Sequence, residues 1–548
     1  MLDSNIKKSY LQTLNNQIIM YKVSFILFLV INAVFYSYAQ PKDFNETIRK
    51  IGLKESKVMD IASSICDVYG PRLTGSAKLS KAQDWAVTEL KSWGLTNVIK
   101  EEWGPFGRGW HLEHFEMHAN TPDYWPVIAY PKAWSPSTNG LVSGDLIYLQ
   151  ANDVKELEKY KGKLNGKIVM LDTIRDLKEW FDAPAKRYNS EELLQMANAP
   201  IPSPRPRRDW SRAGGSFSQD LWNFLDTEQP ICIIDRNYKG DLGTVFVTGA
   251  RQGGQEGKRA QDKDVRIIPQ VTMSVEHYNR LLRLIHKGMS PKLSLNIKSR
   301  YELPNKGMEH NVIAEIPGTE LKDEVVMFGA HFDSWHAGTG ATDNGAGSAV
   351  MMEVVRILNE YVKSTGEKPK RTLRLALWSG EEQGLFGSIN YVRRHFAETE
   401  PGGWIPKALK PEQEKISAYY NLDNGTGKVR GIYTQGNKDV THIFREWLDS
   451  FKDLGANTIT LENTGGTDHL AFDGVGIPGF QFIQEPIAYS NRTHHSNMDN
   501  WDHLVGEDLM QAATVIASVV WQTAQMDEKM PRKPLNMDTP TTTKAKTE

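Results

Sequence analysis

The sequence contains very little cysteine. Among its 548 residues, only Cys66 and Cys232 are cysteines. Two cysteines do not make the disulfide framework of a small exported domain, and their number and spacing exclude a cysteine metal site. Each is therefore predicted to be a small buried apolar residue.

The chain also lacks an excess of charge of either sign. It has 65 Lys and Arg against 67 Asp and Glu, which gives a net charge of −2. Proteins that bind nucleic acid or an anionic membrane surface need a positive field, and this balance does not supply one. We therefore expect no nucleic acid partner.

Long apolar runs are absent as well. Val23–Phe35 is mostly apolar, follows several lysines and precedes Ser37-Tyr38-Ala39, which has the small-x-small pattern of a cleavage site. This run is shorter than the ~20 residues that span a bilayer, and no later run is long enough. Residues 1–39 are therefore predicted to be a signal peptide. Export to the periplasm or the extracellular space follows, without stable membrane insertion.

The composition indicates a globular chain of more than one domain, because 40% of 548 residues are hydrophobic and 24% are charged. Residues 40–129 and 298–530 are predicted to form the main domain. Residues 130–297 are predicted to form a β-rich inserted domain, and residues 531–548, rich in Thr, Lys and Pro, a disordered tail. Strands of the inserted domain are expected at Leu146–Leu149, Lys167–Leu171, Ile231–Ile234, Thr244–Val247, Ile267–Ile268 and Leu293–Ile297.

From residue 309 onward, strands and helices alternate in the sequence pattern. A strong helix is expected at Asn344–Tyr361. The strands are expected at Val325–Ala330, Leu373–Trp378, Ser417–Leu422 and Gly479–Ile483. This alternation predicts an α/β fold, with a mixed central sheet and helices on both of its faces.

Histidine or carboxylate side chains follow each of these four strands. They are His331, Glu381-Glu382, Asp423 and His494-His495, and Asp343 lies at the start of the helix. Ligands gather at the carboxyl ends of strands in such sheets, and His nitrogen with carboxylate oxygen is the ligand set of catalytic zinc. Each residue alone is more often a surface or capping residue. Their occurrence at four successive strand ends predicts a site for two metal ions.

Five short motifs run through this region in a fixed order. They are His331-Phe332-Asp333-Ser334, Gly340 to Gly347, Gly380 to Ser388, Asn421-Leu422-Asp423, and His495-Ser496 with Asp499. Together they resemble the co-catalytic zinc exopeptidases, metallopeptidase family 28, which include bacterial leucyl aminopeptidases, glutamate carboxypeptidases and carboxypeptidase Q. Residues 130–297 resemble the protease-associated domain that many members insert. Gly70–Ser76 and Gly107–Trp110 look most like the carboxypeptidase Q branch.

The resemblance implies two zinc ions per chain. One would be held by His331 and Asp423, the other by Glu382 and His495, with Asp343 bridging them. His494 could also reach a metal. His495 matches the family pattern because a hydroxyl residue follows it.

The resemblance also implies roles in catalysis. Glu381 is expected to be the general base, which takes a proton from the attacking water and delivers it to the leaving amine. Asp333 is placed to accept the second ring N–H of His331 and fix its tautomer, and Asp499 to do the same for His495.

The function implied is that of a secreted zinc exopeptidase, either an aminopeptidase or a carboxypeptidase Q-like dipeptidase, acting on peptides or dipeptides. A single-zinc glutaminyl cyclase shares the order of site residues, but the inserted segment and Gly384–Ser388 favour the peptidase. A catalytically silent, receptor-like binding protein is a further alternative, which the retention of every ligand and of Glu381 disfavours. The preferred peptide end, the native metal and the formation of a homodimer stay open.

Overall fold

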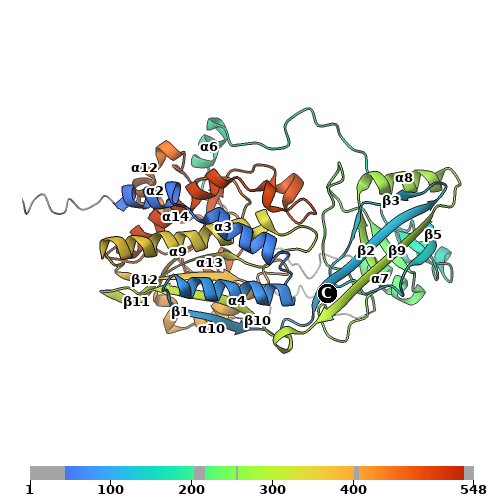
Figure 1. Ribbon diagram of the computed structural model, residues 1–548, viewed down its shortest axis with the longest axis horizontal. Helices are drawn as coiled ribbons and strands as arrows, with labels where there is room; N and C mark the ends of the chain where they lie inside the picture. Colours follow the sequence, from blue (N-terminus) through green and yellow to red (C-terminus); the bar gives the residue numbers. More distant parts are fainter. Residues whose placement is uncertain (1–43, 203–215, 255–256, 400–405, 536–548) are drawn as a thin grey trace, which may run out of the picture.

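A computed structural model of the chain describes residues 44–202, 216–254, 257–399 and 406–535. Figure 1 shows two bodies side by side, each built on its own sheet. We call them the main domain and the second domain. The predicted signal peptide at residues 1–39 lies outside the described residues. Among the residues that are described, no helix is both long and apolar enough to cross a membrane.

The sheet of the main domain has the strand order β1-β10-β12-β11-β15-β18-β16-β17. In this order the strands are Thr96–Trp103, Glu309–Ile316, Arg371–Trp378, Leu321–His331, Ile416–Asn421, Gly479–Gln484, Val429–Tyr433 and Thr458–Thr460. The four strands β12, β11, β15 and β18 are parallel, whereas β1, β10 and β16 pair antiparallel with a neighbour. The prediction of a mixed sheet is thus confirmed.

Helices cover both faces of this sheet. One face packs against α2 (Phe44–Lys54), α3 (Val58–Ser63), α4 (Ala77–Ser92), α9 (Ala346–Thr365), α12 (Thr441–Asp449) and α14 (Gly506–Gln525). The other face packs against α10 (Phe386–His395) and α13 (His469–Asp473). Strand β11 is apolar at successive positions because it is covered twice: Val326 and Phe328 face the first core, and Val325 and Met327 the second.

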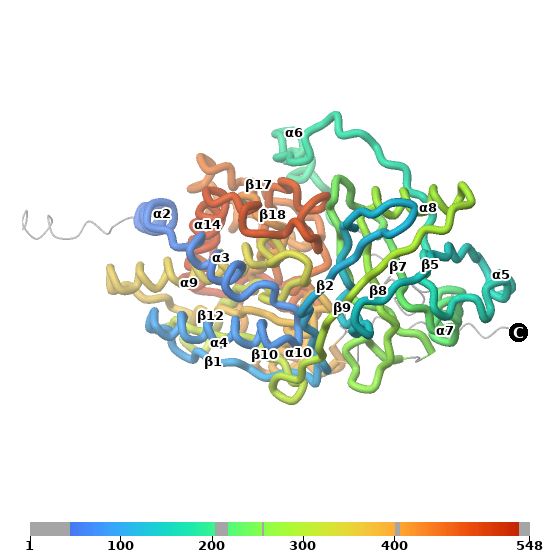
Figure 2. The backbone as a smooth tube through the Cα atoms, turned by 45° about the vertical axis from the view of Figure 1, so that its right-hand side comes forward, coloured from blue at the N-terminus to red at the C-terminus, as the bar shows by residue number. Residues whose placement is uncertain are grey.

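The second domain has a sheet of the order β3-β2-β9-β5-β6-β7-β8-β4. The strands are Trp125–Pro126, Gly109–Thr121, Lys292–Glu302, Val142–Tyr148, Ile168–Met170, Cys232–Asp235, Gln270–Met273 and Ala129–Pro131. One face packs against α8 (Val275–His286) and the other against α5 (Val154–Leu157) and α7 (Ser216–Glu228). Figure 2 shows the chain leaving this sheet and crossing to α6 (Ser190–Ala197), which contacts β17 of the main domain.

The boundaries of the second sheet differ from the predicted segment 130–297. Strand β2 pairs with β9 from Gly109 to Thr121, so residues assigned to the main domain at 40–129 belong to this sheet. Strand β9 extends to Glu302, beyond the predicted end. The two strands form one long antiparallel ribbon that enters and leaves the second domain, and a boundary drawn from composition cuts through it.

Two predicted strands are not strands of the second sheet. Thr244–Val247 forms a single bridge, between Phe246 and Ser496, and Ile267–Ile268 precedes β8 without joining it. Both runs are apolar because they are buried. Ile267 fills a core between the two domains, and Ile268 a core against α7. A short apolar run indicates burial, and in these two segments the burial comes from packing between elements and not from strand pairing.

The predicted disordered tail at 531–548 is partly wrong, because its first residues pack on the main domain. Lys533 forms an ion pair of 2.7 Å with Asp473, and Arg532 donates a hydrogen bond to the Ile416 carbonyl. Residues 536–548 lie outside the described residues.

Candidate metal centre

The predicted site residues lie together at the carboxyl edge of the main sheet. His331 is the last residue of β11, and Asp423 follows β15. Glu381 and Glu382 follow β12, and His495 lies in the loop between β18 and α14. Parallel strands bring their carboxyl ends to one edge, which is why positions so far apart in sequence meet.

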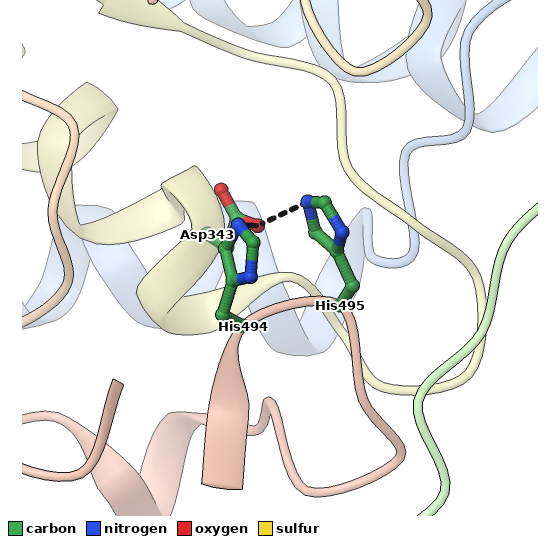
Figure 3. Close-up of side chains that lie close together, drawn as sticks. All are labelled: Asp343, His494 and His495. Carbon is green, nitrogen blue, oxygen red and sulfur yellow. Dashed lines mark ion pairs between the residues drawn. The ribbon is translucent and has the colours of Figure 1, made fainter. Parts of the chain in front are cut away.

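Asp343 lies between two histidines. Its Oδ1 is 3.2 Å from Nε2 of His331, and its Oδ2 is 3.2 Å from Nε2 of His495. Figure 3 shows the second of these contacts as a dashed line, with the ring of His494 beside the same carboxylate. One carboxylate thus offers a separate oxygen to each histidine.

Each histidine has a further carboxylate beside it. Asp423 Oδ1 lies 3.3 Å from His331 Nε2, and Glu382 Oε2 lies 2.9 Å from His495 Nε2. The site therefore consists of two clusters that share Asp343. The ligand atoms of His331, Asp343 and Glu382 also lie within 4.8 Å of one another, so the clusters are contiguous.

His494 is the neighbour that sequence reasoning left open. Its Nε2 is 3.8 Å from Asp343 Oδ2, while its Nδ1 lies 3.5 Å from the Lys239 ammonium. Its ring stacks on His495, with centroids 3.7 Å apart. His495 contacts both Asp343 and Glu382, whereas His494 has only the longer contact with Asp343. The geometry favours His495.

Several polar atoms at this centre are buried and make no hydrogen bond in the described part of the chain beyond the ion-pair contacts given above. They are His331 Nε2, Asp343 Oδ2, Glu382 Oε1 and Asp423 Oδ1. A buried polar atom without a partner is costly, and these four converge on the same space. Nitrogen and carboxylate oxygen atoms in this arrangement fit divalent zinc.

The carboxylates around the two histidines raise the pKa values of both rings. Burial by itself would lower the pKa of His331, but Asp423 and Glu381 raise it well above its usual value. Burial likewise opposes protonation of His495, while the adjacent Glu382 contributes to raising its pKa to about 10. Both rings lie in a strongly negative environment, in which a cation is stabilised.

The pKa values of the carboxylates also reflect an excess of negative charge at this centre. Burial would raise the pKa of Asp343, yet contacts with His331 and His495 hold it well below its usual value. Burial and the charge of Asp343 raise the pKa of Glu382 to about 7. Negative charge exceeds what two histidines neutralise, and bound divalent ions would offset the remainder.

Glu381 lies at the edge of the first cluster. Its Oε2 is 3.9 Å from His331 Nε2, and only 9% of its side chain is exposed. Burial raises its pKa well above the usual value, which the nearby His331 only partly opposes. A carboxylate in such surroundings is a stronger base than one in water.

Asp333 differs from its predicted role. The His331 Nδ1 atom lies 3.1 Å from the main-chain carbonyl of Asp333, but 3.6 Å from its carboxylate. That carboxylate accepts hydrogen bonds from Thr74 Oγ1 at 2.7 Å and from the main-chain N–H groups of Glu381 and Glu382 at 3.2 and 3.3 Å. The side chain of Asp333 therefore holds the Glu381-Glu382 turn in place.

Asp499 was expected to orient His495, but its hydrogen bonds lead elsewhere. Its carboxylate accepts from the main-chain N–H of Thr342 at 2.6 Å, from the Thr342 hydroxyl at 2.7 Å and from the Asp343 N–H at 3.1 Å. Burial and the charge of Asp343 raise the pKa of Asp499 to about 7. Asp499 thus fixes the turn that presents Asp343.

Sequence reasoning did not single out Arg72 and Thr74. Arg72 is fully buried and donates hydrogen bonds to carbonyls of Phe332 and Gly340, in the two loops that carry His331 and Asp343. Both residues lie in Gly70–Ser76, which turn chemistry alone would class as a loop. The available signal was the similarity of this segment to the carboxypeptidase Q branch.

The site opens into a hollow of about 400 Å³. The residues that line it outside the two clusters are Glu381, Gly384, Leu385, Asn424, Gly465, Gly466, Thr467, Tyr489 and His494. A larger hollow of about 650 Å³ beside α2 contains none of the site residues. The smaller one, which reaches the clusters, is the candidate substrate site.

Known proteins resemble this chain over most of its length. The family model Peptidase family M28 matches residues 311–520. Carboxypeptidase Q of Mus musculus is 30% identical over 85% of this chain and 86% of its own length.

Two solved structures share the fold. A peptidase M28 precursor from Shewanella amazonensis has a TM-score of 0.64 at 24% identity and covers 89% of this chain and 98% of its own. The zinc aminopeptidase of Bacillus subtilis has a TM-score of 0.52 at 19% identity, with 86% and 96% covered. Since a relative of 30% identity spans both domains and the family model spans the strands that carry the metal centre, this chain belongs to peptidase family M28, the co-catalytic zinc exopeptidases, and is a peptide hydrolase.

Proposed function

We propose that this protein is an exported two-zinc exopeptidase that hydrolyses the terminal bond of short peptides or the single bond of dipeptides. The observation that carries this proposal is the position of Asp343, which offers one oxygen to the cluster of His331 and the other to the cluster of His495. A bridging carboxylate between two histidine-carboxylate pairs is the ligand pattern of a two-metal hydrolase.

The residues that would hold the ions follow from the two clusters. His331 and Asp423 would hold one zinc, His495 and Glu382 the other, and Asp343 both. When bound there, zinc supplies positive charge that polarises the scissile carbonyl and makes a water molecule more acidic. The four buried atoms without hydrogen-bond partners support this assignment.

Glu381 is proposed as the general base. It lines the hollow, and its burial keeps solvent from competing for the proton that it accepts. It would take a proton from the attacking water and transfer it to the nitrogen of the leaving amine. Asp333 accepts a hydrogen bond from the main-chain N–H of Glu381 and so fixes the backbone position from which the Glu381 side chain extends.

The size of the hollow supports a short substrate. A volume of about 400 Å³ lies near the lower end of the ~300–1,000 Å³ that is usual for small-molecule sites. The relatives described above include by name both a carboxypeptidase and an aminopeptidase. We therefore propose an exopeptidase and leave the preferred end to experiment.

Two further parts of the proposal concern the remaining segments. The second domain, whose sheet runs from Gly109 to Glu302, is proposed to be a protease-associated domain. Export is proposed on the basis of residues 1–39, with their apolar run and cleavage pattern.

The test is hydrolysis of a free dipeptide, its N-acetylated form, its C-amidated form and an amino-acid anilide, with and without chelator. Cleavage should require metal and should fall by about 10²–10⁴-fold in Glu381→Gln, which keeps the shape but loses the base. The blocked form that is still cleaved identifies the free end. If the zinc-loaded protein cleaves none of these substrates, the proposed function is wrong, and glutaminyl cyclase activity is then assayed.

A further inference from the structure

A segment of the second domain pairs with the loop that carries His495. Val245, Phe246 and Val247 are each at most 2% exposed. The Val247 N–H donates to the His495 carbonyl at 2.8 Å, and the Asn497 N–H donates to the Val245 carbonyl at 3.1 Å. These two bonds flank the bridge between Phe246 and Ser496, so a short piece of β-ladder joins the two domains at the metal centre.

Two side chains strengthen this junction. Asn497 accepts a hydrogen bond from the Val245 N–H at 2.7 Å through Oδ1 and donates to the Gly243 carbonyl at 3.3 Å through Nδ2. Lys239, also from the second domain, donates to the Ser490 carbonyl at 3.0 Å. Its ammonium lies 4.1 Å from the ring centroid of Phe246, within the range of a cation–π contact.

The backbone of His495 needs such support. Its φ is +63°, in the left-handed region that a side chain with a Cβ atom rarely adopts. This conformation is strained and persists only where the surroundings hold it. The hydrogen bond from Val247 to the His495 carbonyl acts directly on this residue.

The other histidine is held differently. His331 ends β11, where it pairs in register with Trp378 of β12, and β15 lies on the opposite side of the strand. The sheet of the main domain thus positions His331 and, at the end of β15, Asp423. No residue of the second domain takes part in that pairing among the described strands.

We propose that Val245–Val247 and Lys239 of the second domain, together with Asn497, form a clamp that positions His495 and thereby sets the zinc affinity of the cluster of His495 and Glu382. The cluster of His331 and Asp423 does not depend on this clamp. The second domain therefore contributes to metal binding by positioning His495. This inference rests on the proposed function, because it takes the two clusters to be zinc sites.

Weakening the clamp should lower the affinity for one zinc ion and leave the affinity for the other nearly unchanged. Residues that orient a ligand typically change metal affinity by about 10–100-fold. Asn497→Ala removes both side-chain bonds of Asn497, and Lys239→Met removes the ammonium while keeping the stem over Phe246. In each variant one of the two zinc dissociation constants should rise about 10–100-fold, and the other should stay within about twofold of its value in the unaltered chain. Lys239→Arg, which keeps the positive charge, should keep most of the zinc affinity that Lys239→Met loses.

The experiment is titration of the metal-free full-length chain with zinc in competition with a chromophoric chelator, which yields both dissociation constants without measuring activity. Arg187→Met is the matched control. It breaks another contact between the same two domains, the 2.7 Å ion pair with Asp508, but one that does not involve the His495 loop. This control should change neither constant. Melting curves establish that each variant is folded, and Lys239→Met provides the test if Asn497→Ala does not fold.

The outcomes separate the two hypotheses. If the unaltered chain binds fewer than two zinc ions, the proposed function fails and the clamp fails with it. If it binds two and the clamp variants keep both constants, lose both equally, or behave as Arg187→Met does, only the clamp is refuted. A selective loss at one site in the clamp variants alone supports it.

Discussion

Replacing Arg72 should lower both the stability of the fold and the affinity for zinc. The reason is that its guanidinium joins the loops that carry metal ligands. The side chain is fully buried. It donates hydrogen bonds to the main-chain carbonyls of Phe332 at 2.7 Å, Ile65 at 3.1 Å, Thr339 at 2.9 Å and Gly340 at 2.9 Å. Arg72→Met has a similar length and leaves all four carbonyls without this donor.

The expected loss of stability follows from these contacts. A hydrogen bond from a charged donor contributes about 1.5–3 kcal/mol, but removing a buried charge also relieves the cost of its desolvation. Burial indeed lowers the pKa of Arg72, while Cys66 and the nearby Asp499 oppose that shift. Each buried carbonyl left without a donor costs about 1–3 kcal/mol and the relieved desolvation offsets part of the total, so we expect the free energy of unfolding to fall by about 3–5 kcal/mol.

Urea unfolding measures the stability, and zinc titration together with dipeptide hydrolysis measures the site. Arg371→Met is the matched control, because Arg371 is 1% exposed and binds Glu324 at the opposite end of β12. It should lose comparable stability but keep its zinc affinity and turnover. Arg72→Lys should recover part of both. If Arg72→Met keeps full stability, or loses stability while zinc affinity and turnover stay unchanged, the reasoning is refuted.

Three further predictions test other parts of the structure. Asp343→Asn replaces one shared oxygen by an amide, so one zinc should bind at least ~100-fold more weakly in a competition titration, and an undiminished two-zinc load would contradict the bridging role. Gly340→Ala should lower the free energy of unfolding by more than ~1 kcal/mol in urea, because φ is +67° and the new Cβ would lie 2.2 Å from the Ser334 Cβ; unchanged stability would contradict this. Burial lowers the pKa of His336 to about 4, against 6.5 in the unfolded chain, so its stabilising effect is complete above pH 6.5 and is lost as pH falls toward 4. Between pH 7.5 and 5 this loss should be about 2 kcal/mol in urea unfolding, and equal pH dependence in His336→Gln would refute it.

Much of the main domain was predictable from the sequence because local patterns agreed with the global fold. The strands β11, β12, β15 and β18 are rich in apolar residues and are buried at most successive positions, as expected of strands covered on both faces. Once they are known to be parallel, the rule that their carboxyl ends share an edge brings His331, Glu382 and Asp423 together. Their two-cluster arrangement around Asp343 needed the structure.

The second domain was harder to predict because burial there has several causes. Thr244–Val247 has the apolar pattern of a strand, yet it is buried between domains and pairs with the His495 loop. The ribbon of β2 and β9 joins segments far apart in sequence, and composition gives no register for such a pair. Arg72 and Asp333 act through main-chain groups whose positions are set by tertiary structure, so residue type and spacing alone did not indicate their roles.

Two zinc ions that share Asp343 are the central feature of the proposed metal centre. Anomalous diffraction at the zinc edge from crystals of the zinc-loaded protein tests this in one measurement. It should show two peaks, one between His331, Asp423 and Asp343 and one between His495, Glu382 and Asp343. A single peak, or peaks that do not contact Asp343, would contradict the two-metal centre.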